Sequence, residues 1–180
     1  MNDGTDMDWV IGIPRNPTEN TGVKLNVGQG QIGIYLDGSV MFHPGDGQSY
    51  QNAGKWNRVA YFFEGVDFDP SNGHSTPTNT YHHHVINTAL SSAIDSSVHS
   101  PLVGFAWDGF PVYGPFGYSD AMSPISSITR MQSGYQERNI TGRSTLPSGT
   151  TATGPAIGLK QKSDCMAPNY HTFSLGADKV

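Results

Sequence analysis

The sequence predicts a mainly β fold, either a β-sandwich or a partly open barrel, with one or two short helices. Charged residues make up only 14% of the 180 residues while Gly contributes 22. Much of the polarity therefore comes from Gly, Ser, Thr and Asn, which support tight turns and weaken helix interiors. Short stretches of β-branched and aromatic residues, some separated by Asp-Gly pairs, also favour strands joined by tight turns.

Residues 30–42, GQIGIYLDGSVMF, give the clearest strand signal. Apolar residues alternate from 32 to 36 and again at 40 and 42, and Asp37-Gly38 between them predicts a hairpin with a type I′ turn. Further strands are expected within 56–69 and within 79–86. The Gly- and Pro-rich segment 100–118 predicts two short strands around an Asp108-Gly109 turn.

Two segments predict short helices. Leu90, Ile94 and Val98 lie at helical spacing within 87–98. Residues 119–138 offer Ser123 as an N-cap and Pro124 at the first helical position. The chain is expected to form one domain over residues 1–180, of which 159–180 is atypical.

Charge and composition exclude several classes of protein. The formal net charge is -5 and the basic residues are scattered, so we expect no nucleic-acid partner. No apolar run reaches the 18 or more residues of a membrane span, and the polar, acidic start does not resemble a signal peptide. Cys165 is the only cysteine, which excludes an internal disulfide and a four-cysteine zinc site.

Four of the seven histidines lie within residues 72–86, NGHSTPTNTYHHHVI. On a strand His82 and His84 would share one face, while His83 would point the other way. A turn at Asn72-Gly73 would place His74 beside that pair. Three neutral imidazoles with an open fourth position are typical of a catalytic zinc site. Copper also accepts imidazole, and we favour zinc over copper.

Each histidine also has a structural interpretation. A His-rich strand can form a solvated or hydrogen-bonded face, although the apolar flanks of this run are unlike a tag. His99 could be a further ligand, a residue that hydrogen-bonds a ligand, or a residue favoured at a helix C-terminus. His43 and His171 are isolated and are expected to be structural or on the surface.

Two further residues are catalytic candidates. Asp108 could act as a general base beside a metal or be only the first residue of an Asp-Gly turn. Tyr113 could donate a hydrogen bond to developing negative charge or simply cover the core.

The runs GHSTPTNTYHHHVI and HSPLVGFAWDGFPVYGPFGY, with flanking segments over roughly residues 9–158, resemble the YHYH-domain proteins. The resemblance implies an extracellular or periplasmic location and a motif at residues 81–84, preceded by His74. It also matches His99 and Asp108 to family blocks. Two departures stand out: His83 occupies a position that is usually Tyr, and residues 159–180 replace a second Tyr/His-rich strand, of which His171 could be a remnant.

Three hypotheses follow. The chain is a metal-dependent hydrolase or lyase acting on an extracellular polymer or a small molecule, with His74, His82 and His84 as ligands. Alternatively, it binds metal without chemistry, or it is a structural or carbohydrate-contacting β domain. We rank metal binding of some kind first.

Overall fold

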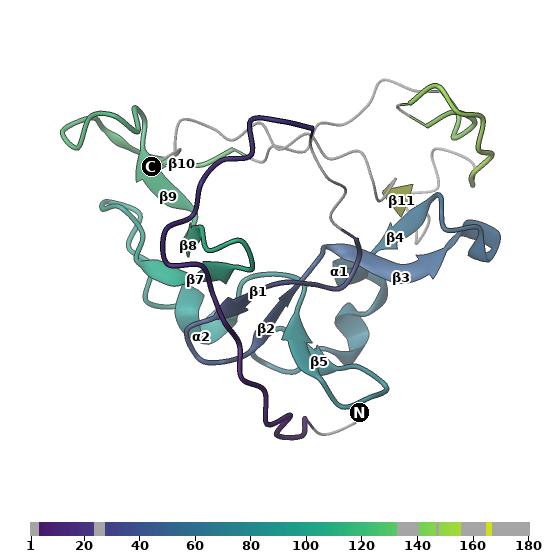
Figure 1. Cartoon of the computed structure of the whole chain (residues 1–180), viewed down its shortest axis with the longest axis horizontal. Helices are drawn as coiled ribbons and strands as arrows, with labels where there is room; N and C mark the ends of the chain where they lie inside the picture. The colour runs from purple at the N-terminus through teal and green to yellow at the C-terminus, as the bar shows by residue number, and fades with distance from the viewer. Residues whose placement is uncertain (1–3, 24–27, 133–140, 147, 156–164, 167–180) are drawn as a thin grey trace.

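The computed structural model describes residues 4–23, 28–132, 141–146, 148–155 and 165–166 (Figure 1). The prediction of a mainly β fold with short helices is confirmed: a six-stranded mixed sheet is accompanied by a three-stranded and a two-stranded sheet. The six-stranded sheet does not close into a barrel, because β5 and β8 remain its two edges. In the part of the chain that the structure describes, no helix is long and apolar enough to cross a membrane.

The main sheet has the strand order β5-β6-β2-β1-β7-β8. Neighbouring strands within this sheet are antiparallel, except that β2 and β6 are parallel. These strands are β1 Gln31–Tyr35, β2 Val40–Phe42, β5 Gly73–Ser75, β6 Tyr81–His83, β7 Leu102–Ala106 and β8 Pro111–Tyr113.

The smaller sheets and the helices surround this sheet. The three-stranded sheet has the order β11-β4-β3, with β3 Gly45–Ser49, β4 Asn57–Val59 and β11 Cys165–Met166. The two-stranded sheet pairs β9 Phe116–Tyr118 with β10 Ile128–Arg130. The helical segments are α1 Ala60–Phe63, α2 Thr88–Ser91 and the 3-10 turns η1 Tyr50–Asn52 and η2 Gly65–Asp67.

Three hairpins of the main sheet close with the same turn. One loop residue is left-handed in each: Gly38 (φ 86°), Asn79 (φ 65°) and Gly109 (φ 92°). Its amide donates to the carbonyl three residues earlier at 2.9 to 3.0 Å. Gly and Asn adopt positive φ at low cost, which explains their use here. The hairpins at Asp37-Gly38 and Asp108-Gly109 are confirmed, but the type I′ geometry is wrong because Asp37 lacks a positive φ.

A bulge in β1 changes which apolar residues share a face. Gln31 lies opposite Phe42 and Ile34 lies opposite Val40, with the irregularity between Gln31 and Gly33. The extra residue reverses the alternation, so Ile32 packs with Tyr35 and Met41 on the other face. The uniform alternation predicted from 32 to 42 is therefore wrong at Ile32.

Among the residues that the structure describes, two apolar clusters form the core. The larger lies under α2 on one face of the main sheet, with Tyr35, Met41 and Val103 buried and Leu90 packed against them. The smaller is centred on Trp56, which is 1% exposed and packs on Leu146. The Trp56 indole Nε1 donates to the Ala152 carbonyl at 2.5 Å, so this buried polar group is satisfied.

The predicted helices are shorter than expected or absent. Over 87–98 only α2 forms, capped by the Asn87 side chain, which accepts from the Ala89 amide at 2.7 Å. The predicted helix over 119–138 is wrong where residues are described: the chain makes turns and then β10. The Ser126 hydroxyl donates to the Asp120 and Ser123 carbonyls, and such side-chain bonds compete with a helix.

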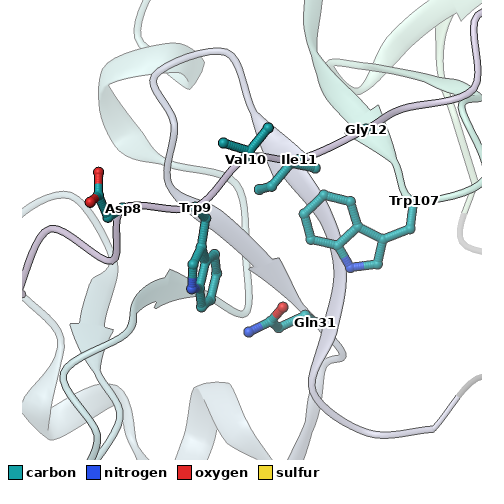
Figure 2. Close-up of a pocket in the computed structure, with 7 residues that line it drawn as sticks. All are labelled: Asp8, Trp9, Val10, Ile11, Gly12, Gln31 and Trp107. Atoms are coloured by element: carbon teal, nitrogen blue, oxygen red, sulfur yellow. The ribbon is translucent and has the colours of Figure 1, made fainter.

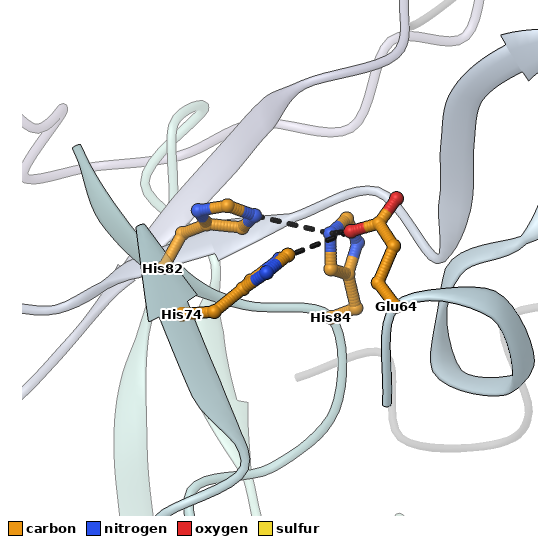
Figure 3. Close-up of side chains that lie close together, drawn as sticks. All are labelled: Glu64, His74, His82 and His84. Carbon is orange, nitrogen blue, oxygen red and sulfur yellow. Dashed lines mark hydrogen bonds and ion pairs between the residues drawn. The ribbon is translucent and has the colours of Figure 1, made fainter. Parts of the chain in front are cut away.

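The strand predicted within 56–69 ends early, and this departure positions the site. Only β4, Asn57–Val59, is extended; α1 and η2 follow directly and turn the chain. Glu64 caps the C-terminal end of α1 and leads into η2. The turn brings its carboxylate to the His-bearing face of the main sheet (Figure 3).

Candidate metal centre

Three imidazoles and one carboxylate converge at one edge of the main sheet (Figure 3). One ligand atom from each of Glu64, His74, His82 and His84 lies within 4.8 Å of all the others. We call these four residues the His/Glu cluster. The donor set, three nitrogens and one carboxylate oxygen, is one that zinc and copper accept, so the cluster could hold a metal ion.

The sheet positions the three histidines. His74 on β5 lies directly opposite His82 on β6 in the antiparallel register, so both rings project from the same face. His84 lies one residue beyond β6, and its Nε2 is 3.1 Å from the Nε2 of His82. The prediction that His82 and His84 share a face is confirmed. His74 does lie beside them, but the β5–β6 turn over residues 76–80 brings it there, and not the predicted turn at Asn72-Gly73, which lies at the start of β5.

Main-chain carbonyls determine where two of these rings carry their protons. His82 Nδ1 lies 3.1 Å from the Thr80 carbonyl, and His84 Nδ1 lies 2.7 Å from the His43 carbonyl. A carbonyl can only accept, so a neutral ring must keep its proton on Nδ1 and leave Nε2 as a lone pair. Metal-bound histidines commonly donate their other ring N–H to such a carbonyl.

As a result, the lone pairs of ring nitrogens and of a carboxylate oxygen face one another in the cluster. The Nε2 atoms of His82 and His84 are 3.1 Å apart, and a Glu64 carboxylate oxygen lies 3.1 Å from His84 Nε2. The same oxygen lies 3.0 Å from the buried His74 Nε2, which forms no aligned hydrogen bond with the residues described. Such an arrangement needs a cation or a proton at its centre. Tetrahedral zinc with ligands at about 2.0–2.1 Å separates its ligand atoms by about 3.4 Å, close to these distances.

Burial and charge prepare the cluster for a cation. Burial, supported by the neighbouring His84 and His74, lowers the pKa of His82 to about 4, so its ring is neutral at pH 7. Burial alone would raise the pKa of Glu64, but hydrogen bonds from the His74 and His84 rings in their protonated form outweigh it and hold that pKa far below its usual range, so the carboxylate is ionised whether a proton or a metal ion lies between these groups. An ionised carboxylate beside a neutral imidazole is the protonation state that a metal ion requires.

Aromatic rings enclose the cluster on two sides. Phe42 stacks on His82 with ring centroids 3.8 Å apart, and Phe68 lies 4.9 Å from His74. The relative exposure of the side chains is 5% for His84, 12% for His74 and 21% for Glu64. Solvent therefore reaches the cluster mainly from the side of Glu64, while the imidazoles lie in an environment of low polarity.

The other two motif residues face away, as the strand alternation predicted. Tyr81 donates its hydroxyl to the Asp69 carboxylate at 2.6 Å. His83 is 1% exposed, and its ring lies edge-on to Tyr35 with centroids 5.6 Å apart. Its two ring nitrogens form no aligned hydrogen bond with a described residue. Burial lowers the pKa of His83, although the nearby Asn72 main chain opposes the shift. His83 thus belongs to the core face.

The remaining candidates lie outside the His/Glu cluster. His99 donates from Nδ1 to the Ser100 carbonyl at 2.8 Å and contacts the rings of Tyr113 and Tyr118. Asp108 is exposed in the β7–β8 turn, where its carboxylate approaches the Phe110 amide at 3.5 Å. The catalytic roles of Asp108 and Tyr113 stay predictions, as does a ligand role for His99. His171 lies outside the described residues.

His43 contributes to the site through its main chain. Its ring is buried, and its Nδ1 accepts from the Gly45 amide at 2.9 Å. Its carbonyl is the group that orients His84. The expectation of a structural histidine is therefore confirmed.

Sequence reasoning missed Glu64. A single carboxylate in the apolar run AYFFEGV, residues 60–66, was a usable signal, since an isolated charge among aromatic residues needs a partner. Expecting a strand there concealed it, because no strand periodicity connects residue 64 with residues 74 to 84.

Comparison with known proteins gives one match. The model of the YHYH protein family matches residues 10–165. No curated protein matches the chain, and no solved structure does. The exported location that the earlier resemblance implied stays a prediction. The match extends over most of the chain and includes the whole His/Glu cluster, and the chain therefore belongs to the YHYH protein family.

Proposed function

We propose that this domain binds one divalent transition-metal ion, zinc in preference to copper, through Glu64, His74, His82 and His84. One observation supports the proposal above the others. Two main-chain carbonyls hold the protons of His82 and His84 on Nδ1, so their Nε2 lone pairs face each other and an anionic carboxylate. In a purely structural cluster, one of these rings would be expected to present an N–H to the other.

The chemistry of the donors selects the kind of metal. Magnesium and calcium take mostly oxygen ligands, which a set of three imidazoles does not supply. Imidazole and carboxylate are common zinc ligands at tetrahedral sites, and the pairs Glu64–His74, Glu64–His84 and His82–His84, whose donor atoms lie 3.0 to 3.1 Å apart, have a spacing close to that of such a site. Copper also binds imidazole, so it is the competing ion in every titration.

Metal analysis of protein purified without a polyhistidine tag tests the proposal. We expect about one zinc per chain by mass spectrometry, and we expect His82→Ala to weaken zinc binding in calorimetry by at least about 100-fold, since a ligand is lost. The matched control is His99→Ala, which removes an imidazole outside the cluster and should leave the affinity unchanged. A metal-free native protein that takes up no zinc would refute the proposal.

A metal-dependent hydrolase or lyase is the second candidate, and the position of Glu64 favours it. Glu64 is the most exposed of the four donors and lies at the end of a four-residue helix rather than on the main sheet. If its carboxylate moves aside, a water can take the fourth position, where zinc lowers the pKa of water to about 7. Against this, the low pKa of Glu64 makes it a better ligand than proton acceptor.

Ester hydrolysis separates these candidates. With p-nitrophenyl acetate as the probe, a hydrolase should show zinc-dependent turnover that Glu64→Gln reduces while zinc remains bound. A binding domain should show no turnover above that of free zinc. Asp108→Asn and Tyr113→Phe test the catalytic roles predicted for those residues in the same assay.

A further inference from the structure

A second site lies between the N-terminal segment and the main sheet. A pocket of about 500 Å³ is lined by Trp9 and Ile11 from the N-terminal segment and by Gln31 and Trp107 from the main sheet and its β7–β8 turn. Figure 2 shows the two indole rings at opposite sides, with the Gln31 side chain between them. The volume is within the range of about 300–1,000 Å³ that small-molecule sites occupy.

Contacts far apart in the sequence hold these walls. The N-terminal segment crosses the main sheet, drawn in purple in Figure 1. Near one end, the Thr5 amide donates to the Asn79 carbonyl in the β5–β6 turn at 3.1 Å. At the other end Pro14 packs on Gly109, where an added methyl group would overlap the Pro14 carbonyl oxygen. The Trp107 amide donates to the Ile32 carbonyl of β1 at 3.1 Å, which fixes the opposite wall.

The lining combines broad apolar faces with polar groups. Trp9 is 43% exposed, although an indole ring normally lies largely buried. The Gln31 amide offers both a donor and an acceptor, and Asp8 adds a carboxylate at one end of the pocket. A wholly apolar ligand would leave these groups without partners, which is costly. A pyranose ring suits them better, because its C–H faces are apolar and its hydroxyls lie around the edge.

The negative charge of the protein also restricts which sugars the pocket can bind. Asp8 lines the pocket, and the chain carries a formal net charge of -5. A uronic acid or a sulfated sugar would be repelled by both. We infer that the pocket of Trp9, Trp107 and Gln31 binds a neutral pyranose ring of an oligosaccharide.

The pocket and the His/Glu cluster share one face of the main sheet. Gln31 on β1 lies directly opposite Phe42 on β2, and Phe42 stacks on His82. With neighbouring strands about 4.8 Å apart, the step from β1 across β2 to β6 is about 10 Å. A bound oligosaccharide could therefore extend from the pocket towards the cluster. Sugar binding itself requires no metal, so it stands independently of the proposed function.

Tryptophan fluorescence tests the inference, since Trp56 is buried and gives a constant background. The probes are hexasaccharides of β-1,4-glucose, β-1,4-mannose and α-1,4-glucose, with hexagalacturonic acid as the acidic comparison and a proline decapeptide as the alternative ligand. We expect saturable binding of at least one neutral hexasaccharide at millimolar concentration or below, and weaker binding of the acidic one. Trp107→Ala and Trp9→Ala should each weaken binding at least 10-fold, while Trp9→Phe should retain most of it.

Two controls keep the result specific. Phe62→Ala removes another exposed aromatic ring outside the pocket and should leave sugar binding unchanged. Chelation with EDTA should also leave it unchanged. The inference is overturned if no neutral hexasaccharide binds, if the tryptophan variants bind as well as the native protein, if chelation abolishes binding, or if the proline peptide binds more tightly than the sugars.

Discussion

Two imidazole tautomers are the residue-level basis of the proposed metal site. The carbonyls of Thr80 and His43 hold the Nδ1 protons of His82 and His84, so the ring nitrogens that face the cluster are free to bind a cation. Burial keeps His82 neutral well below pH 7. The protein thus presents its ligands in the required protonation state before any metal arrives.

Nitrogen-15 NMR can observe this arrangement directly. In metal-free protein at pH 7.5 we expect long-range ¹H–¹⁵N spectra to show His82 and His84 protonated at Nδ1, because each Nδ1 has a carbonyl acceptor, with at most one proton on the facing pair of Nε2 atoms. Zinc should then shift the Nε2 signals and leave the Nδ1 protons in place. A proton on both Nε2 atoms in the metal-free protein would contradict the account.

The sequence predicts three of the four residues of the His/Glu cluster. Strand alternation separates His82 from His83, and the proximity of His74 to His82 is predicted, although through a turn at Asn72-Gly73 and not through the β5–β6 turn that produces it. Glu64 could not be found in this way, because it reaches the site through a chain reversal at α1 rather than through a sheet register. His99 and Asp108 are candidates by residue type and by matching family blocks, neither of which carries information on distance.

At the scale of elements, the β5–β6 hairpin determines whether the imidazoles meet. A methyl group at Gly73 would overlap the Tyr81 hydroxyl and approach Cε1 of His83 within 2.7 Å. Only glycine allows β5 to pack against the rings of Tyr81 and His83 on the core face. The position of His74, the next residue, depends on that close packing.

Gly73→Ala should therefore weaken both folding and metal binding. We expect a loss of about 1–3 kcal/mol in the free energy of unfolding from overpacking, and a lower zinc affinity because His74 moves away from His82. Chemical denaturation and calorimetry measure the two effects. Gly47→Ala is the matched control, since nothing lies within 4 Å of its added methyl group and β3 is exposed there. Equal stabilities for the two variants would rule this explanation out.

Local sequence patterns predict some elements of this fold and fail for others. The two Asp-Gly hairpins were predictable because a left-handed glycine is a local requirement. The bulge in β1, the early end of β4 and the missing helix near Ser123 occur where strands pair, and the register of that pairing is not visible in local sequence patterns. Local propensity is a weak guide where tertiary contacts decide.

For the whole molecule, buried titratable groups predict how stability depends on pH. The pKa of His82 and of His83 is lower in the folded protein than in the unfolded chain, so the unfolded chain binds more protons as the pH falls below about 6.5. The pKa of Asp69 is also lowered: burial opposes the shift, but the Tyr81 hydroxyl and the Gly73 and Ser71 amides outweigh it. All three groups destabilise the folded state in acid.

With EDTA present, the free energy of unfolding should decrease as the pH falls from about 6.5 to 4, through the two imidazoles, and decrease further below about 4 through Asp69 and Glu64, whose pKa values are both lowered. Replacing His82 with Gln should make the free energy of unfolding depend less steeply on pH between pH 4 and 6.5. The reduction should correspond to up to about one proton fewer taken up on unfolding. Urea titrations across this range provide the measurement. A slope identical to that of the native protein would show that His82 is not buried in its neutral form.

Zinc should also stabilise the whole fold, since its ligands come from α1, β5 and β6 together with the bend after β6. Zinc at about 1,000 times its dissociation constant adds about 4 kcal/mol to the free energy of unfolding if the unfolded chain binds none. Calorimetric melting with and without EDTA should show the corresponding rise in melting temperature. His82→Ala should abolish that rise, whereas His99→Ala should preserve it.

Anomalous scattering from crystals of the protein purified without a tag tests the central claim most directly. Data collected on both sides of the zinc and copper absorption edges identify the element as well as its position. We predict a single zinc peak about 2.0–2.1 Å from the Nε2 atoms of His74, His82 and His84, with a Glu64 oxygen as the fourth protein ligand. Well-ordered imidazoles with no anomalous peak between them, in crystals soaked with zinc, would contradict the account.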